Sequence, residues 1–187
     1  MNESERKVVL VTGSATGVGR ACAVKFASMG FDVVVNYPGA DEEEAKETVR
    51  LVEAEGMAAL LSCCDVSRDE EVVAMLAATE KVFGHLDVLV NAAGATAFVK
   101  HDDLQSLSEA QWDSILAVNT KGPFFVTRAA VPLLEGRKGA AVVSVSSVAG
   151  ISGFGSSIAY CASKGALNTM TRSLARALAP KIRVNAV

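Results

Sequence analysis

Six short runs of nearly uninterrupted apolar residues recur along the chain, each separated from the next by a longer segment of mixed polarity. They lie at 8–11, 32–36, 58–63, 86–90, 140–145 and 182–187. Strands that are apolar on both sides are typical of a parallel sheet whose two faces are covered. We therefore expect six buried strands.

The segments between these runs have the features of helices. Glycine often follows the last turn of a helix, and Gly30, Gly56 and Gly84 close the first three segments. The patterns Ser67-Arg68-Asp69-Glu70 and Ser108-Glu109-Ala110-Gln111 are typical of capping boxes at helix starts. The expected helices cover 18–29, 41–55, 67–83, a long helical region from 108 to about 134, and 160–178.

Alternation of strands and helices with short links is typical of a doubly wound α/β fold, Rossmann-like and built as three αβα layers. The chain has 187 residues and shows no linker, repeat or low-complexity segment. We expect a single domain over 1–187. Because the sequence stops at the end of a strand, we also expect that the C-terminal part of this domain is missing.

Composition narrows the classes of function. The net charge is −3 and the charges are interspersed, so neither nucleic acid nor a membrane is an expected partner. No apolar run approaches membrane-spanning length. Cys22, Cys63, Cys64 and Cys161 lack metal-ligand spacing, so no metal site is expected. Reduced, mostly buried thiols are typical of a cytoplasmic protein.

A glycine loop follows the first strand directly and reads Thr12-Gly13-Ser14-Ala15-Thr16-Gly17-Val18-Gly19. Glycines permit a tight turn and a close approach of the backbone, and the amides at a helix start bind phosphate. Three residues separate the first two glycines, unlike the common dinucleotide fingerprint. An ordinary strand-to-helix turn is the alternative. We interpret the loop as a dinucleotide site with candidate contacts at Gly13, Ser14, Thr16, Gly17, Val18 and Gly19.

The second strand ends at Asn36 and Tyr37, where an NAD site usually carries an acidic residue for the ribose. Asp32 enters this strand and is expected at the wrong edge of the sheet. A neutral Asn36 does not repel a 2′-phosphate, so NADP(H) is favoured over NAD(H). Arg20 and Lys46 are the cations that remain as candidates to bind that phosphate.

Tyr160 and Lys164 are four residues apart, so a helix places both side chains on one face. An ammonium close to a phenol favours the phenolate. Tyr160 is therefore a candidate proton donor or acceptor, assisted by Lys164. This spacing also arises by chance in many proteins, so a catalytic role for the pair depends on support from the other motifs.

Three further segments complete a pattern. Asn91-Ala92-Ala93-Gly94 follows the fourth strand, Asn119 lies in the long helical region, and Ser144-Val145-Ser146-Ser147 closes the fifth strand. With the glycine loop and the Tyr160–Lys164 pair, the chain resembles the short-chain dehydrogenase/reductase family, including 3-oxoacyl-carrier-protein reductases. The resemblance runs from the first strand to the last residue.

The resemblance implies four catalytic residues. Ser147 would bind the substrate oxygen, and Tyr160 would act as general acid in reduction and general base in oxidation. Lys164 would assist Tyr160 and bind the nicotinamide ribose. Asn119 would hold a water that links Lys164 to solvent.

The resemblance also implies a cofactor path. Asp65 and Val66 would flank the adenine, and Asn36 and Tyr37 would lie near its ribose. Thr16 stands where many NADP-dependent relatives carry arginine, so NAD(H) stays open. Further contacts are implied at Asn91, Ala92, Ala93 and Gly94.

The expected function is an oxidoreductase that transfers hydride between NAD(P)(H) and a ketone or secondary alcohol. A 3-oxoacyl thioester, a sugar or polyol, and a steroid-like ketone all remain open as substrates. The resemblance implies a homotetramer or homodimer and a substrate lid beyond Val187. The alternative is a non-catalytic dinucleotide-binding regulatory or scaffold protein of the same fold.

Overall fold

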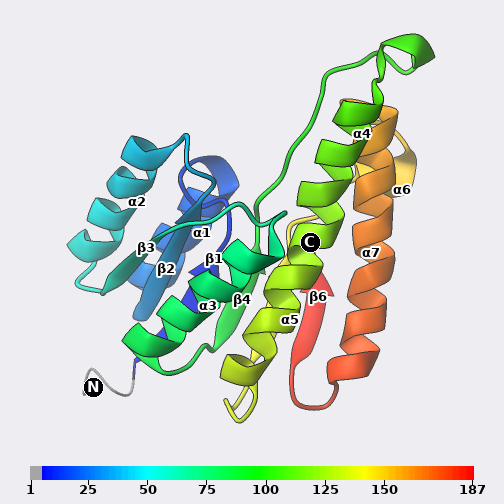
Figure 1. Ribbon diagram of the computed structural model, residues 1–187. Helices are drawn as coiled ribbons and strands as arrows, with labels where there is room; N and C mark the ends of the chain where they lie inside the picture. The colour runs from blue at the N-terminus through cyan, green and yellow to red at the C-terminus, as the bar shows by residue number, and fades with distance from the viewer. Residues whose placement is uncertain (1–5) are drawn as a thin grey trace.

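The computed structural model describes residues 6–187 and contains a six-stranded sheet with helices on both faces (Figure 1). Every neighbouring pair of strands is parallel, and the order is β3-β2-β1-β4-β5-β6. This confirms the doubly wound α/β fold. The strands are β1 Lys7–Val11, β2 Phe31–Tyr37, β3 Ala59–Cys63, β4 Val88–Asn91, β5 Ala141–Ser144 and β6 Arg183–Ala186.

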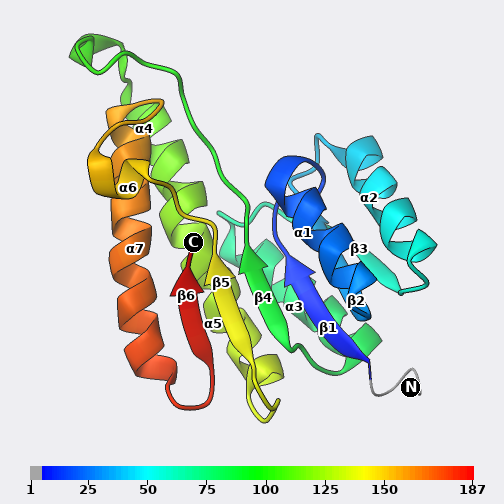
Figure 2. The same ribbon diagram turned by 180° about the vertical axis from the view of Figure 1, so that it is seen from behind.

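The helices form the two outer layers, with α1 and α2 in front of the sheet when it is seen from behind (Figure 2). Helices α3, α5 and α7 pack on the opposite face. The α-helices are α1 Gly17–Ser28, α2 Glu42–Ala54, α3 Asp69–Phe83, α4 Glu109–Leu116, α5 Gly122–Leu134, α6 Ala149–Ser152 and α7 Ile158–Leu178. A 3-10 turn, η2, covers Leu104–Ser106, and a π-helix, η3, covers Ala117–Lys121.

The sheet separates two apolar cores. Successive side chains of a strand point to opposite faces, so Val8 and Leu10 of β1 pack with α3 and α5, whereas Val9 and Val11 pack with α1 and α2. All four side chains are buried. This burial on both faces explains the unbroken apolar runs in the sequence.

The long helical region holds a break that the sequence pattern did not predict. Helices α4 and α5 are joined by the π-helix η3, and Asn119 lies within it, fully buried. Pro123 sits in the first turn of α5 and has no N–H to donate toward the carbonyl of Asn119 one turn earlier. Single π-turns of this kind are often found at functional sites.

The two predicted capping boxes have different outcomes. Ser108 caps α4, with its side chain accepting from the backbone N–H of Gln111, and the reciprocal bond is also present. The box at Ser67 is wrong, because Arg68 is the N-cap of α3 and makes no side-chain cap. The backbone N–H of Ser67 instead donates to the carboxylate of Asp65, a local turn that competes with the box.

The expectation of mostly buried cysteines is also wrong. Cys64 is buried, Cys22 and Cys161 are half-buried, and Cys63 is exposed because it ends the edge strand β3. None of the described helices is long and apolar enough to cross a membrane.

Candidate active site

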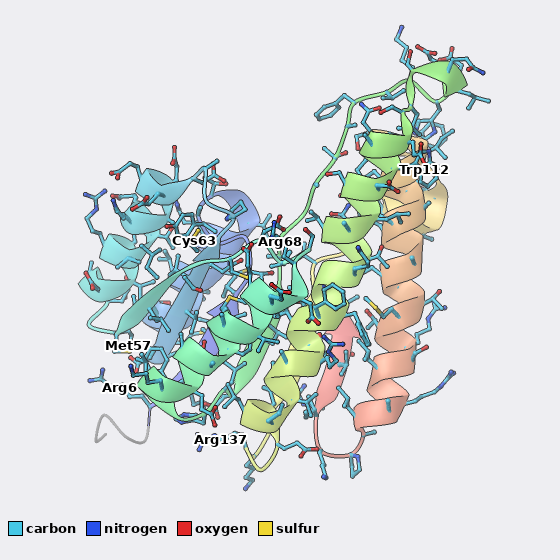
Figure 3. All side chains as sticks on the ribbon, viewed as in Figure 1. Arg6, Met57, Cys63, Arg68, Trp112 and Arg137 are labelled. Carbon is cyan, nitrogen blue, oxygen red and sulfur yellow. The ribbon has the colours of Figure 1, made fainter. Side chains whose placement is uncertain are left out.

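The predicted site residues gather at one edge of the sheet. In Figure 3, Cys63, the last residue of β3, and Arg68, which follows β3, mark the end of the sheet where the strands finish, and Arg6 and Arg137, which precede β1 and β5, mark the opposite end. The glycine loop and the segments after β4 and β5 lie at the first of these ends. In open α/β sheets this is the edge that binds ligands, at the point where the strand order reverses.

A cavity of about 540 Å³ lies at this edge, between the ends of β1 and β4. It extends from the glycine loop to the side chains of Tyr160 and Lys164. The predicted residues that line it are Gly13, Thr16, Gly17, Val18, Gly19, Asn36, Asp65, Val66, Ala92, Ala93, Gly94, Tyr160 and Lys164.

Other predicted residues lie behind the wall of the cavity. The hydroxyl of Ser14 donates to the carbonyl of Val11, 2.7 Å away, and Ser14 is fully buried. Asn91 donates to the hydroxyl of Thr127, and its Oδ1 is buried without a hydrogen-bond partner among the described residues. Tyr37 is buried in the core shared with α1 and α2.

Ser147 also lies outside the lining, whereas its neighbour Ser146 is part of it. The hydroxyl of Ser147 accepts from the backbone N–H of Ala149 at 3.1 Å, at the start of α6. The hydroxyl of Ser146 is 2.6 Å from Oδ1 of Asn168 on α7. The two serines therefore fix the turn between β5 and α6.

Two glycines make the loop after β1 possible. A Cβ on Gly13 would come within 2.6 Å of the Cα of Ala93, and the φ of Gly13 is +61°. A Cβ on Gly19 would come within 2.2 Å of the carbonyl oxygen of Gly13. Any side chain at either position would push the loop away from α1 or from the segment after β4.

Two threonines hold the same loop and were not predicted as site residues. The hydroxyl oxygen of Thr12 accepts from the N–H groups of Ala92 and Ala93, at 3.0 and 3.1 Å. Thr48 of α2 donates to the carbonyl of Ser14 at 2.9 Å. For Thr12, its place directly before Gly13 is the sequence signal; for Thr48 we find no signal in its neighbours.

The amide of Asn36 is committed to the loop. Its Oδ1 accepts from the N–H of Gly13 at 3.0 Å, and its Nδ2 donates to the carbonyl of Cys64 at 2.9 Å. Asn36 therefore joins the end of β1 to the end of β3, which explains a polar residue buried at this position.

The first turn of α1 presents open amides to the cavity. Its N-cap, Thr16, makes no side-chain cap hydrogen bond, and Gly17, Val18 and Gly19 all line the cavity. The positive end of the helix dipole and the free N–H groups of a first turn attract an anion. This arrangement fits the diphosphate of a dinucleotide.

Tyr160 and Lys164 meet at the other end of the cavity, both from α7. This helix begins after Ser157, whose hydroxyl accepts from the N–H of Tyr160 at 3.2 Å. Nζ of Lys164 lies 5.7 Å from the centroid of the Tyr160 ring and donates to the carbonyl of Val145 at 2.8 Å. Burial lowers the pKa of Lys164, which is 5% exposed.

Asn119 fixes the segment after β4 against α7. Its Oδ1 accepts from the N–H of Ala95 at 2.7 Å, and its Nδ2 donates to the carbonyl of Ala95 and to the hydroxyl of Ser163. Ser163 directly precedes Lys164. The side chain of Asn119 therefore joins the segment after β4 to the residue of α7 that precedes Lys164.

Comparisons with known proteins agree with this geometry. The short chain dehydrogenase family matches residues 7–187. An oxidoreductase of Thermotoga maritima, described as uncharacterized, is 41% identical over 182 residues, which are 97% of this chain and 70% of the relative. The 3-oxoacyl-acyl-carrier-protein reductase FabG of Staphylococcus aureus is 37% identical, with 97% of this chain and 72% of the relative covered.

Two further matches are a curated relative and a solved structure. A 3beta-hydroxysteroid dehydrogenase of Mediterraneibacter gnavus is 37% identical over 188 residues, 100% of this chain and 66% of the relative. A crystal structure from Burkholderia xenovorans, reported as a candidate short-chain dehydrogenase/reductase, superposes with a TM-score of 0.95 at 38% identity. That match covers 97% of this chain and 76% of the other.

Proposed function

This chain belongs to the short-chain dehydrogenase/reductase family, and on that premise we propose that it interconverts a ketone and a secondary alcohol with NAD(P)(H). The proposal is carried by one observation, that the same continuous cavity is lined by the first turn of α1 and by Tyr160 and Lys164. A bound nicotinamide supplies the hydride in such reactions. The residues of the chain supply the binding, the orientation and the proton.

The cofactor-binding part is assigned to the first half of the chain. The amides of Gly17, Val18 and Gly19 would hold the diphosphate, because the first turn of α1 has no side-chain cap. Asp65 and Val66, at the end of the cavity beyond β3, would flank the adenine. Asn36 holds the glycine loop in place, since its side-chain amide is already bonded to the N–H of Gly13 and the carbonyl of Cys64.

Tyr160 is assigned as the group that moves the proton. In reduction its hydroxyl protonates the oxygen of the carbonyl, and in oxidation its phenolate removes the proton of the alcohol. The ammonium of Lys164 stabilises the phenolate through space and has N–H groups left for ribose hydroxyls beyond the one given to Val145. On the family resemblance alone, Ser147, which adjoins Ser146 of the lining, is assigned to the substrate oxygen and Asn119 to a water near Lys164.

The substrate is proposed by class. The relatives include a 3-oxoacyl-acyl-carrier-protein reductase and a 3beta-hydroxysteroid dehydrogenase. Their names refer to substrates of different chemical classes, an acyl thioester and a steroid. We therefore propose an acyl thioester or a cyclic ketone as the first substrates to try. A homotetramer or homodimer and a cytoplasmic location stay predictions.

The test follows nicotinamide absorbance with NADH and NADPH against a panel of ketones that includes a 3-oxoacyl thioester and a 3-oxosteroid. Tyr160→Phe should lower kcat by about 10²–10⁴ while cofactor affinity changes little, because the variant loses the proton donor and keeps the ring. Cys161→Ala, at the next position on α7 and outside the cavity lining, is the matched control.

Two outcomes would contradict this assignment. Substantial turnover by Tyr160→Phe would show that another group moves the proton. Tight cofactor binding without turnover of any ketone would instead support the non-catalytic dinucleotide-binding protein.

A further inference from the structure

The cavity has a distinct end beyond the glycine loop, where Asn36, Pro38 and Asp41 line it. In a doubly wound fold the diphosphate lies at the start of the first helix and the adenosine ribose near the end of the second strand. Asn36 belongs to the end of β2, and Pro38 and Asp41 follow it. If the proposed function holds, this end receives the ribose that carries a 2′-hydroxyl in NAD(H) and a 2′-phosphate in NADP(H).

The charges along the cavity differ between its two ends. Among the described residues that line it, the one cation is Lys164, which lies with Tyr160 at the far end. The carboxylates of the lining belong to Asp41 and Asp65, both on the β2–β3 side. A 2′-phosphate would therefore add negative charge where the lining is already acidic.

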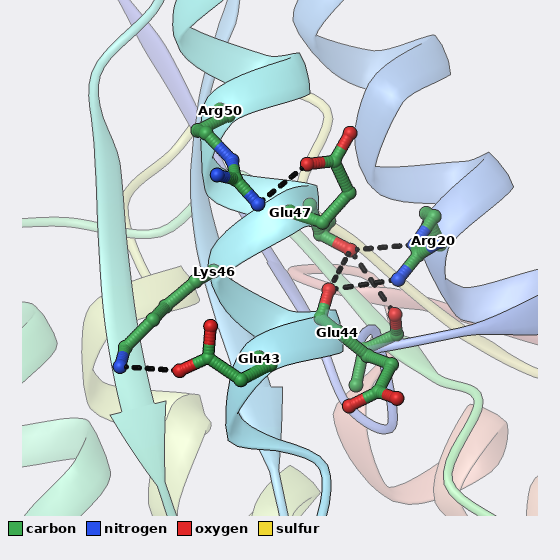
Figure 4. Close-up of polar contacts among 8 residues, drawn as sticks. Arg20, Glu43, Glu44, Lys46, Glu47 and Arg50 are labelled. Atoms are coloured by element: carbon green, nitrogen blue, oxygen red, sulfur yellow. Dashed lines mark hydrogen bonds and ion pairs between the residues drawn. The ribbon is translucent and has the colours of Figure 1, made fainter.

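The two cations that could have bound this phosphate are engaged elsewhere (Figure 4). Arg20 donates through Nε to the hydroxyl of Thr48 and through Nη2 to the carbonyl of Glu44, at 2.9 and 2.8 Å. These bonds join α1 to α2. Lys46 is 2.9 Å from a carboxylate oxygen of both Glu42 and Glu43.

The carboxylate of Asp41, in contrast, is not used by its own helix. Asp41 is the N-cap of α2, but its side chain makes no cap hydrogen bond, and its backbone carbonyl accepts from Ala45 at 2.9 Å. It is half-buried and borders the cavity. A carboxylate accepts hydrogen bonds from sugar hydroxyls and repels phosphate.

We infer that this chain prefers NAD(H) over NADP(H), and that Asp41 is the residue that sets the preference. The inference rests on the proposed function and reverses the preference expected from the sequence. That expectation depended on a neutral Asn36, whose amide is turned to the glycine loop. Discrimination comes instead from Asp41, four residues after the end of β2, with Arg20 hydrogen-bonded to Thr48 and Glu44 of α2 and Lys46 paired with Glu42 and Glu43.

The experiment measures the Kd of NADH and of NADPH by isothermal titration with the purified protein at low salt. We expect NADH to bind roughly tenfold more tightly, since two anions a few ångströms apart repel appreciably near a protein surface. Asp41→Asn should narrow the ratio several-fold, mainly by tightening NADPH. Glu53→Gln is the control, because it removes an exposed carboxylate from the same helix three turns away, outside the cavity lining.

Each outcome has a separate meaning. If the wild-type protein binds NADPH as tightly as NADH, or more tightly, the inference fails and the proposed function stands. If Asp41→Asn leaves the ratio unchanged, Asp41 is not the determinant. If neither dinucleotide binds, the proposed function fails as well.

Discussion

At the scale of single residues, the most unusual environment belongs to the ammonium of Lys164. It lies in the interior beside the ring of Tyr160, and its hydrogen bond goes to a neutral carbonyl, that of Val145. No carboxylate pairs with it among the described residues. A buried cation without a counter-ion destabilises the folded protein and attracts a polar ligand.

This environment makes stability depend on pH in a defined direction. Because burial lowers the pKa of Lys164 in the folded protein, the unfolded chain binds more protons between that pKa and the ordinary value of 10.5. Its unfavourable contribution is full below the lowered pKa and fades as the pH rises toward 10.5. The difference in free energy of unfolding between Lys164→Met and the wild type should therefore shift in favour of the wild type with rising pH.

Urea unfolding of the cofactor-free protein from pH 7 to pH 10 measures this difference. Lys138→Met is the matched control, because it removes the same charge from an exposed position. A constant difference between Lys164→Met and the wild type across this range would show that the Lys164 amine is not desolvated.

Sequence reasoning predicted residues whose partners are near in the chain and missed those whose partners are distant. Tyr160 and Lys164 follow from the period of a helix. The bonds of Asn36 to Gly13 and Cys64 join positions 23 and 28 residues away, so neither could be read from spacing. The same holds for Thr12, which holds two amides about 80 residues further on.

At the scale of elements, helix α6 is the smallest piece that matters to the site. Gly150 faces α7 so closely that an added Cβ would lie 2.6 Å from the carbonyl carbon of Lys164. Gly165, the next residue of α7, is in a different position, since its Cβ would meet the carbonyl oxygen of Gly150 at 3.6 Å, an ordinary contact. At this helix–helix contact Gly150 therefore has no room for a methyl group, whereas Gly165 does.

Alanine substitutions should separate these roles. Gly150→Ala should destabilise the protein by about 1–3 kcal/mol, because α6 must move off the backbone of Lys164. Gly165→Ala should be neutral or stabilise by up to about 1 kcal/mol, because alanine is the better helix former. Urea denaturation of both variants tests this, and a shift of the same sign in both would contradict the predicted packing.

The strands were predicted to within about two residues because both faces of the sheet are apolar, and α1, α2 and α3 because a glycine follows the last turn of each. Helix α6 has four residues, too few for a period to show. The π-helix at Asn119 depends on how α4 and α5 continue through Pro123, which an apolar pattern does not record. The predicted capping box at Ser67 does not form because the N–H of Ser67 donates to the carboxylate of Asp65 instead.

At the scale of the whole molecule, the cavity takes its lining from both halves of the sheet. Gly13 and Asn36 come from the β1–β3 half, and Tyr160 and Lys164 from the helix that follows β5. The proposed dinucleotide would span these parts and bind the folded chain but not the unfolded one. Its binding and the unfolding of the chain would therefore be linked.

The linkage has an expected size. NADH at 100 times its Kd should add about 2.7 kcal/mol to the free energy of unfolding, which raises the Tm of a protein of this size by roughly 5–10 °C. Calorimetry with and without NADH measures the shift, and adenosine at the same concentration is the control, because it lacks the diphosphate. An unchanged Tm at saturating NADH would contradict preferential binding of NADH to the folded chain.

The pairing of β1 with β4 also bears on how the chain folds. Val9 lies beside Val88 in the sheet, whereas it lies beside Val33 on its other side, so one neighbour of β1 is synthesised long before the other. Closing the longer loop carries the larger entropy loss, and contacts distant in sequence slow folding. We therefore expect β1, β2 and β3 to associate first. Docking of β4 against β1 is then the slow step, and the binding cavity forms only after it.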